Sequence, residues 1–336
     1  MRFLTFLICL FIPVFASAQE WEDQKLFGPV NKGTALRVLS STDTSFFAPI
    51  VEDFISANPS VSVEYLVTGT ADIDRRFRAA PDTFDVVISS AMDLQLKLAN
   101  DGFAAQLADI EHPQWAQWHD SLFAFTSEPA AIVVNRHALA GFPTPRTRQD
   151  LIRLMREAPE HFYGRVGTYD VRQSGLGYLF ATQDARASET YWRLTEVMGS
   201  INARLYCCSG QMIDDLIEGN LVVAYNVLGS YAMARALDAE HLVVILPSEF
   251  PTTMMRTVFK SQSAPQSDIA EAFIRHLLDL QAQGDPVNFP LPPLPIGEQS
   301  ERQTTIDLNP ALMTYLDQMK RGSFIREWED AIVQDE

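Results

Sequence analysis

Residues 35–54 read ALRVLSSTDTSFFAPIVEDF, and their pattern decides the fold class. The apolar run at 35–39 is typical of a short buried strand, and polar residues follow it at 40–45. Four apolar residues then recur at the spacing of one helix face: Phe47, Ile50, Val51 and Phe54. Strand, polar loop and helix in this order form the first part of a strand-helix-strand unit.

The same order returns in the next segment of the chain. Residues 61–67 alternate like a strand, and 71–80 match a helix. The apolar run at 84–88 is again a strand, and Ser89-Ser90 opens the helix after it. Two such units with short connections predict an α/β fold in which helices cover both faces of a parallel sheet. Ligands of such sheets bind beyond the carboxyl ends of the strands.

A second set of alternating elements follows in the middle of the chain. Further strands are predicted at 129–135, 164–168, 221–225 and 242–246, and further helices at 148–157, 175–185, 189–198 and 209–218. The length of 336 residues also suggests two domains. We therefore predict two lobes joined by a hinge. The first lobe covers 19–126, the second covers 127–250, and the chain returns with its C-terminal helices to the first lobe at 251–336.

The N-terminus predicts export. Arg2 precedes an apolar run at 3–15, and Ala16-Ser17-Ala18 is a small-residue cleavage site. We therefore expect a signal peptide at 1–18, cleaved after Ala18. No later segment has the apolar length that a membrane span needs, so we expect a soluble protein of the periplasm. The formal net charge of −17 argues against nucleic acid and other polyanions as partners.

Three motifs carry a resemblance to a known family: LRVLSS at 36–41, FDVVISS at 84–90 and AYNVLGSY at 224–231. With the N-terminal signal, their order resembles that of periplasmic solute-binding proteins. The similar subgroup joins ferric-iron-binding proteins to the phosphoglycerate transport regulatory protein and to sugar-phosphate binders. The resemblance implies the type 2 periplasmic binding fold. It also implies a monomer that serves either the permease of an ABC importer or, as an alternative, the periplasmic domain of a two-component sensor kinase.

Catalytic motifs are missing from the sequence. It contains no Gly-x-Ser-x-Gly, no phosphate-loop motif and no His-Glu-x-x-His. We therefore expect a binding protein without a cofactor rather than an enzyme, with an exported hydrolase as the alternative.

Candidate binding residues lie at the starts of several predicted helices. Backbone N–H groups and the positive end of the helix dipole can receive an oxyanion there, although these residues are also ordinary N-caps. Arg172 would give a phosphate or carboxylate a bidentate cation, or would pair with Asp170 at the surface. The ligand expected from this set is an organic phosphate such as a phosphorylated sugar or glycerate. The candidates are Ser41, Thr42, Thr70, Ser89, Ser90, Arg172, Ser174, Gly175, Asn226, Gly229, Ser230 and Tyr231.

Two further alternatives concern metal and sulfur chemistry. Ferric-binding members of the resembling group use a tandem pair of tyrosines, because Fe(III) favours phenolate oxygen. Tyr231 has no tyrosine neighbour, so iron is the weaker alternative and no metal ligand is predicted. Cys207 and Cys208 are adjacent, and they either close a vicinal disulfide or remain as two thiols.

Overall fold

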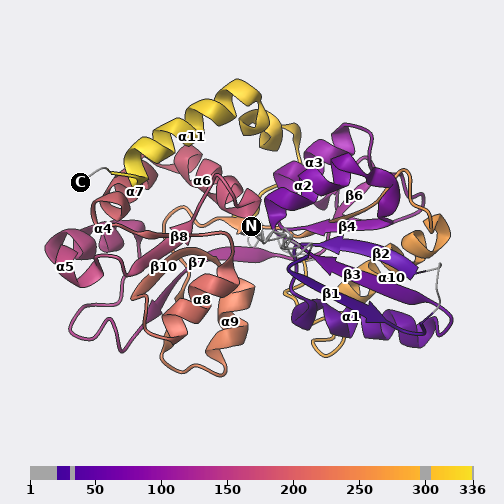
Figure 1. The fold of residues 1–336 in the computed structure, drawn as a ribbon, viewed down its shortest axis with the longest axis horizontal. Coiled ribbons are helices and arrows are strands. Elements are labelled where there is room, and N and C mark those ends of the chain that lie inside the picture. Colours follow the sequence, from indigo (N-terminus) through magenta and orange to yellow (C-terminus); the bar gives the residue numbers. More distant parts are fainter. Residues whose placement is uncertain (1–20, 31–34, 296–303, 335–336) are drawn as a thin grey trace, which may run out of the picture.

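The computed structural model describes residues 21–30, 35–295 and 304–334. The predicted signal peptide therefore lies outside the described residues. Two β-sheets, each flanked by helices, form two lobes side by side (Figure 1). The fold is thus the two-lobed α/β architecture that the sequence predicts. Within the described ranges, no helix has both the length and the apolar character to cross a bilayer.

The first lobe contains a seven-stranded sheet in the order β1-β3-β2-β4-β13-β6-β5. Its strands are β1 (Asp23–Phe27), β2 (Ala35–Ser40), β3 (Ser62–Val67), β4 (Val86–Ser89), β5 (Gln117–Trp118), β6 (Leu122–Ala124) and β13 (Thr257–Lys260). The parallel core that the sequence predicts is confirmed, because β2 pairs in parallel with β3 and β4. The whole sheet is mixed, since β1 and β13 run antiparallel to their neighbours. The chain reaches β13 from the other lobe. Strand β13 therefore begins at the end of the sheet where β2, β3 and β4 finish.

Successive side chains of a strand point to opposite faces of this sheet, and helices cover both faces. Leu36 and Val38 of β2 pack in one buried cluster with α1, whereas Leu39 packs in another with α2 and α3. The predicted apolar face of α1 is buried, and its Phe54 ring lies 5.1 Å from that of Phe273 in α10. The helices are α1 (Thr44–Ala57), α2 (Thr70–Ala79), α3 (Met92–Asn100) and α10 (Ser267–Gln283).

The second lobe contains a sheet in the order β11-β7-β10-β8-β9, with β12 beside β7. Its strands are β7 (Glu128–Asn135), β8 (Val166–Tyr169), β9 (Arg204–Tyr206), β10 (Val223–Leu228), β11 (Leu242–Ile245) and β12 (Thr253–Met254). Its helices are α4 (Arg148–Glu157), α5 (Pro159–Phe162), α6 (Gly175–Ala187), α7 (Thr190–Ser200), α8 (Ser209–Ile217) and α9 (Gly229–Ala236).

Strand β10 begins and ends further along the chain than the sequence predicts. We expected the strand to end at Asn226, and this was wrong: β10 continues to Leu228. Asn226 has a φ of 63°, and the pairing with β7 shifts register between Ala224 and Val227. A bulge of this kind accommodates one irregular residue without ending the strand.

The chain crosses between the lobes at two adjacent places. Strand β6 of the first lobe is followed by β7 of the second, and β12 of the second lobe is followed by β13 of the first. The crossing segments are residues 125–127 and 255–256, and they form the hinge. The predicted lobe boundaries at 126/127 and 250/251 lie near these crossings.

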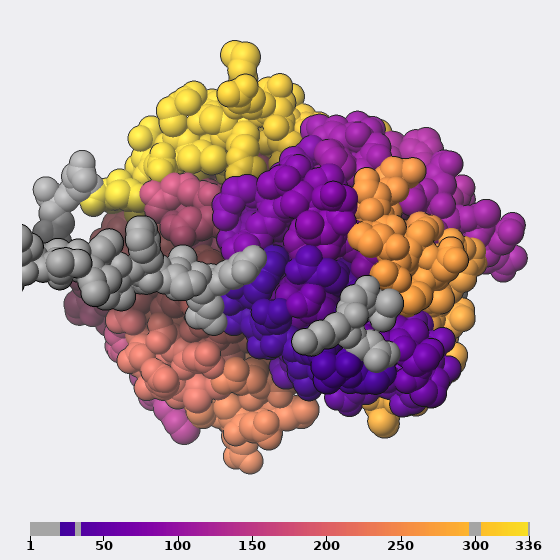
Figure 2. Space-filling view, turned by 45° about the vertical axis from the view of Figure 1, so that its right-hand side comes forward, coloured from indigo at the N-terminus to yellow at the C-terminus, as the bar shows by residue number. Residues whose placement is uncertain are grey.

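The C-terminal helix differs from the expectation that the tail returns to the first lobe. Helix α11 (Gln318–Ile332) packs against α7 of the second lobe, because Phe324, Trp328 and Ile332 lie on one face of it and join the second-lobe core. The preceding 3-10 helix η3 (Pro310–Leu316) contacts α3 of the first lobe. The C-terminal segment, yellow in Figures 1 and 2, thus bridges the two lobes.

Candidate functional site

A cavity of about 260 Å³ lies between the two lobes. Its first-lobe lining is Glu22, Ser41, Asp43, Thr68, Gly69, Thr70 and Ser90, and its second-lobe lining is Tyr169, Gln173, Ser174, Leu176, residues 207–211, Asp214, Leu228 and Tyr231. A larger hollow of about 600 Å³ lies between residues 109–113 and α10, but both of its walls belong to the first lobe. Only the smaller cavity has walls that a hinge motion would bring together, so it is the candidate site.

Six helices begin at this cavity: α1, α2 and α3 from the first lobe, and α6, α8 and α9 from the second. Each follows a strand directly, and the carboxyl ends of these strands meet between the lobes. Asp43, Gly69, Ser174, Cys208 and Leu228 are N-cap residues of five of these helices and line the cavity. The arrangement directs backbone N–H groups and positive helix ends at one point.

Five predicted binding residues line the cavity: Ser41, Thr70, Ser90, Ser174 and Tyr231. The hydroxyl oxygens of all but Ser90 accept hydrogen bonds from backbone N–H groups. Ser41 Oγ accepts from Ser90 at 3.2 Å, and Ser174 Oγ accepts from Gly177 at 3.0 Å, which is an N-cap contact. Residues from the starts of five helices that are far apart in the sequence are therefore neighbours.

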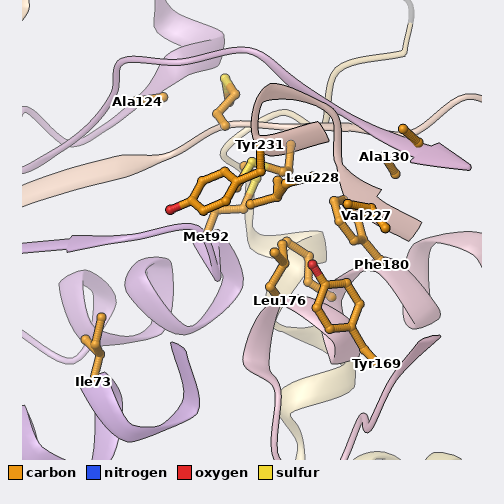
Figure 3. Packing of buried hydrophobic residues seen from close by; sticks show 14 of the residues in the cluster. Ile73, Met92, Ala124, Ala130, Tyr169, Leu176, Phe180, Val227, Leu228 and Tyr231 are labelled. Carbon is orange, nitrogen blue, oxygen red and sulfur yellow. The ribbon is translucent and has the colours of Figure 1, made fainter. Parts of the chain in front are cut away.

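Thr70 and Tyr231 also join the lobes to each other. The N–H of Leu176 donates to Thr70 Oγ1 at 3.1 Å, and the N–H of Asp43 donates to Tyr231 Oη at 3.1 Å. The Tyr231 ring reaches toward the first lobe (Figure 3), where it lies 4.4 Å from the ring of Phe46. These contacts hold the lobes together around the cavity.

Four other predicted binding residues lie behind the cavity wall. Thr42, Ser89, Asn226 and Ser230 bond to other protein groups: Thr42 accepts from Arg256, Ser89 Oγ accepts from the N–H of Ala91 at 3.1 Å, Asn226 donates to Asp184 at 2.9 Å, and Ser230 donates to Glu128. They are not among the residues that line the cavity, so a direct contact with a ligand stays a prediction for them.

Gly175 and Gly229 lie where the wall needs a small residue. A Cβ at Gly229 would lie 2.9 Å from the carbonyl oxygen of Pro129, and one at Gly175 would lie 3.0 Å from Leu94 Cδ1. They provide close packing instead of lining the cavity.

Arg172 forms the surface ion pair that was the alternative to anion binding. Its Nη2 lies 2.8 Å from Asp170, its Nη1 lies 3.1 Å from Glu329, and its guanidinium covers the Trp328 ring at 5.6 Å. Although burial raises the pKa of Asp170, hydrogen bonds from Arg172 hold that pKa below its ordinary value. Arg172 is not among the residues that line the cavity.

The sequence interpretation missed a buried ion pair beneath the site. Arg256, in the second crossing segment, and Glu128, at the start of β7, are both fully buried, with Arg256 Nε 3.0 Å from Glu128 Oε1. Arg256 also donates to Thr42 of the first lobe, and Glu128 accepts from Ser230 of the second. The pair therefore connects the hinge to loops on both sides of the cavity. A charged residue between the apolar pairs 254–255 and 258–259 was the available sequence signal.

Acidic groups dominate the charge of the cavity wall. Glu22, Asp43 and Asp214 line it, whereas its described lining contains no Lys, Arg or His. Asp214 pairs with Arg235 at 2.6 Å. Partial burial raises the pKa of Glu22 and of Asp43, and the negative charge of Asp43 raises that of Glu22 further. The first-lobe side of the cavity thus carries negative charge that no lining cation compensates.

The cysteine pair forms part of the same wall. The sulfur atoms of Cys207 and Cys208 are joined as a vicinal disulfide at the start of α8. The described part of the chain holds no group of three or more His, Cys, Asp or Glu side chains that could bind a metal ion. Burial raises the pKa of the Tyr231 hydroxyl, which opposes the phenolate that Fe(III) binds.

Comparison with known proteins places this geometry in context. No protein-family model and no curated protein matches the chain. A solved structure described as the substrate-binding protein of an ABC transporter from Agrobacterium tumefaciens is 28% identical, with a TM-score of 0.84 over 92% of this chain and 98% of that one.

Two more distant structures show the same fold. The periplasmic binding protein AfuA from Actinobacillus pleuropneumoniae, solved with fructose-6-phosphate, has 16% identity and a TM-score of 0.70, covering 90% of this chain and 100% of its own. Iron-bound HitA from Pseudomonas aeruginosa has 12% identity and a TM-score of 0.65, covering 89% and 99%. The chain therefore has the two-lobed fold of the periplasmic binding proteins that its sequence motifs resemble.

Proposed function

We propose that this protein is the solute receptor of an ABC importer and that it encloses a small oxyanion-bearing solute between its lobes. The observation that carries the proposal is the convergence of six helix N-termini on one interlobe cavity of about 260 Å³. Each such terminus favours a nearby anion by about 0.3–1 kcal/mol, and enclosure increases the effect. The Agrobacterium neighbour, described as the substrate-binding protein of an ABC transporter, supports the transport role.

Export to the periplasm and a monomeric state belong to the same proposal. The predicted cleavage after Ala18 would release the described chain on the far side of the inner membrane. The sensor-kinase alternative is not favoured by any of the neighbours, since those that name a system name an ABC transporter.

The cavity wall favours a particular class of oxyanion. An organic phosphate without a cationic group would place its charge on the helix N-termini but would also face Glu22 and Asp43 without a lining cation to offset them. A solute that carries an amine as well as a phosphate, phosphonate or carboxylate satisfies both parts of the wall. We therefore rank an amino-substituted oxyanion ahead of a sugar phosphate within the same proposal.

A thermal-shift screen tests this function. Refolded, ligand-free protein without residues 1–18 is heated with aminoethylphosphonate, fructose 6-phosphate, phosphoglycerate, inorganic phosphate, succinate or ferric citrate. A solute at one hundred times its Kd adds about 2.7 kcal/mol to the free energy of unfolding. We expect the largest shift with aminoethylphosphonate and a smaller one with the organic phosphates. A shift with ferric citrate alone would contradict the proposal.

A further inference from the structure

Asp93 is a buried acid with an incomplete set of hydrogen bonds. It lies in the first turn of α3, its relative exposure is 2%, and its Oδ1 is buried without a hydrogen-bond partner among the described residues. It is not among the residues that line the solute cavity. The proposed function therefore gives it no role.

The helix that carries this acid takes part in an interlobe contact. Helix α3 of the first lobe contacts α6 of the second, and it also contacts η3, which leads to α11. The contact is close, because a Cβ at Gly175 in α6 would lie 3.0 Å from Leu94 in α3. The bond from the N–H of Leu176 to Thr70 ties the same helix start to α2. Separation of the lobes would break these contacts and admit water to the first turn of α3.

The charged groups around Asp93 do not compensate its burial. Burial raises the pKa of Asp93 to about 7. Hydrogen bonds from the backbone N–H groups of Leu94 and Asp93 and, after them, the charge of Arg321 in α11 lower this pKa by smaller amounts, and Asp74 of α2 raises it. Tyr178 of α6 also faces the acid, and Arg321 covers its ring at 4.6 Å. The helix that packs on the second lobe thus contributes a cation, Arg321, which makes no hydrogen bond to the carboxylate within the described part of the chain.

We propose that closure of the two lobes is coupled to protonation of Asp93, so that acid favours the closed, solute-holding form. The inference rests on the proposed function, since it assigns a regulation to the same hinge motion. An open form returns Asp93 to water and to an ordinary carboxyl pKa. The closed form then binds more protons than the open form, and linkage requires closure to strengthen as the pH falls.

The size of the coupling follows from the two pKa values. Between them, each unit of pH changes the closing constant about tenfold, and between about pH 7 and about pH 5 the total change is roughly 50-fold. Above about pH 8 both forms are ionised and the dependence disappears. The effect is lost when Asp93 cannot ionise.

The test measures closure without any solute. Small-angle scattering gives the radius of gyration, and hydrogen exchange at Leu176 reports the interlobe bond, for the wild type and Asp93→Asn between about pH 8 and about pH 5. We expect the wild type to become more compact and more protected in acid. We expect Asp93→Asn to be compact at every pH.

The matched control is Asp72→Asn, because Asp72 is an acid of the first-lobe helix α2 that pairs with Arg75 within its own helix. It should keep the wild-type response to pH. If the wild type shows no change between the two pH values, or if Asp93→Asn keeps the wild-type pH response, the coupling is refuted. Because no solute is added, failure of the solute screen leaves this outcome unaffected, and the two proposals fail separately.

Discussion

Replacing Arg256 by Met should destabilise the protein strongly, because the change leaves Glu128 as an unpaired charge in the core. Both side chains have 0% relative exposure, and two Arg256 nitrogens bond to Glu128 at 3.0 and 3.1 Å. Removing one partner of such a pair costs about 3–5 kcal/mol. Although burial raises the pKa of Glu128, Arg256 holds it below its ordinary value, so the stability that this acid contributes is lost as the pH falls through its native pKa.

Urea denaturation of four variants (Arg256→Met, Glu128→Leu, the double variant and Arg153→Met), followed by circular dichroism, measures the effect. Arg256→Met should lower the free energy of unfolding by about 3–5 kcal/mol, whereas Arg256→Met with Glu128→Leu should lose much less, since no charge is left unpaired. Arg153→Met removes an exposed ion pair of similar length and should cost less than about 1 kcal/mol. A loss below about 1 kcal/mol in Arg256→Met, or a double variant as unstable as the sum of both single changes, would refute the reasoning.

Four further changes test the site and the packing. Tyr231→Phe removes the acceptor for the N–H of Asp43 and should weaken solute binding by about 0.5–1.5 kcal/mol in calorimetry; unchanged affinity would remove that bond from the closed form. Arg172→Ala should leave the affinity unchanged, and a tenfold loss would return this residue to the site. Glu22→Gln should weaken aminoethylphosphonate binding but not fructose 6-phosphate binding, and equal effects would rule out a contact with the amine. Gly199→Ala would place a Cβ against the backbone of α11 and should cost about 1–3 kcal/mol in urea, whereas Gly322→Ala should be tolerated; equal stability would contradict the packing of α11 on α7.

Much of the fold could be predicted because it depends on local patterns. The strand at 35–39 and the buried helix face with Phe47 and Phe54 are confirmed. Both could be predicted because apolar residues repeat along the sequence with the period of a strand or of a helix. Strand β13 and the position of α11 could not be predicted in this way. Both depend on which distant part of the chain an apolar segment packs against, and a single sequence does not specify that packing partner.

The residues of the candidate site also fall into those that local patterns predict and those that depend on distant parts of the chain. Ser41, Thr70, Ser90 and Ser174 could be predicted because polar residues between a strand and the start of the next helix gather at one edge of a sheet. Arg256 and the acidic residue Glu22 could not, since their place at the cavity depends on the hinge crossing and on the pairing of β1 with β3. The vicinal cysteines were visible in the sequence, but their position in the cavity wall was not.

The most direct test of the central claim is a calorimetric titration of the ligand-free protein and of a variant with a blocked cavity. Gly210 lines the cavity with no atom within 4 Å of an added Cβ, so Gly210→Trp should fill the interlobe space without disturbing the fold. Aminoethylphosphonate and fructose 6-phosphate are titrated into both proteins. We predict saturable binding of one solute molecule per wild-type chain and loss of that binding in Gly210→Trp at an unchanged Tm. Equal binding by both proteins would contradict the claim that the interlobe cavity holds the solute.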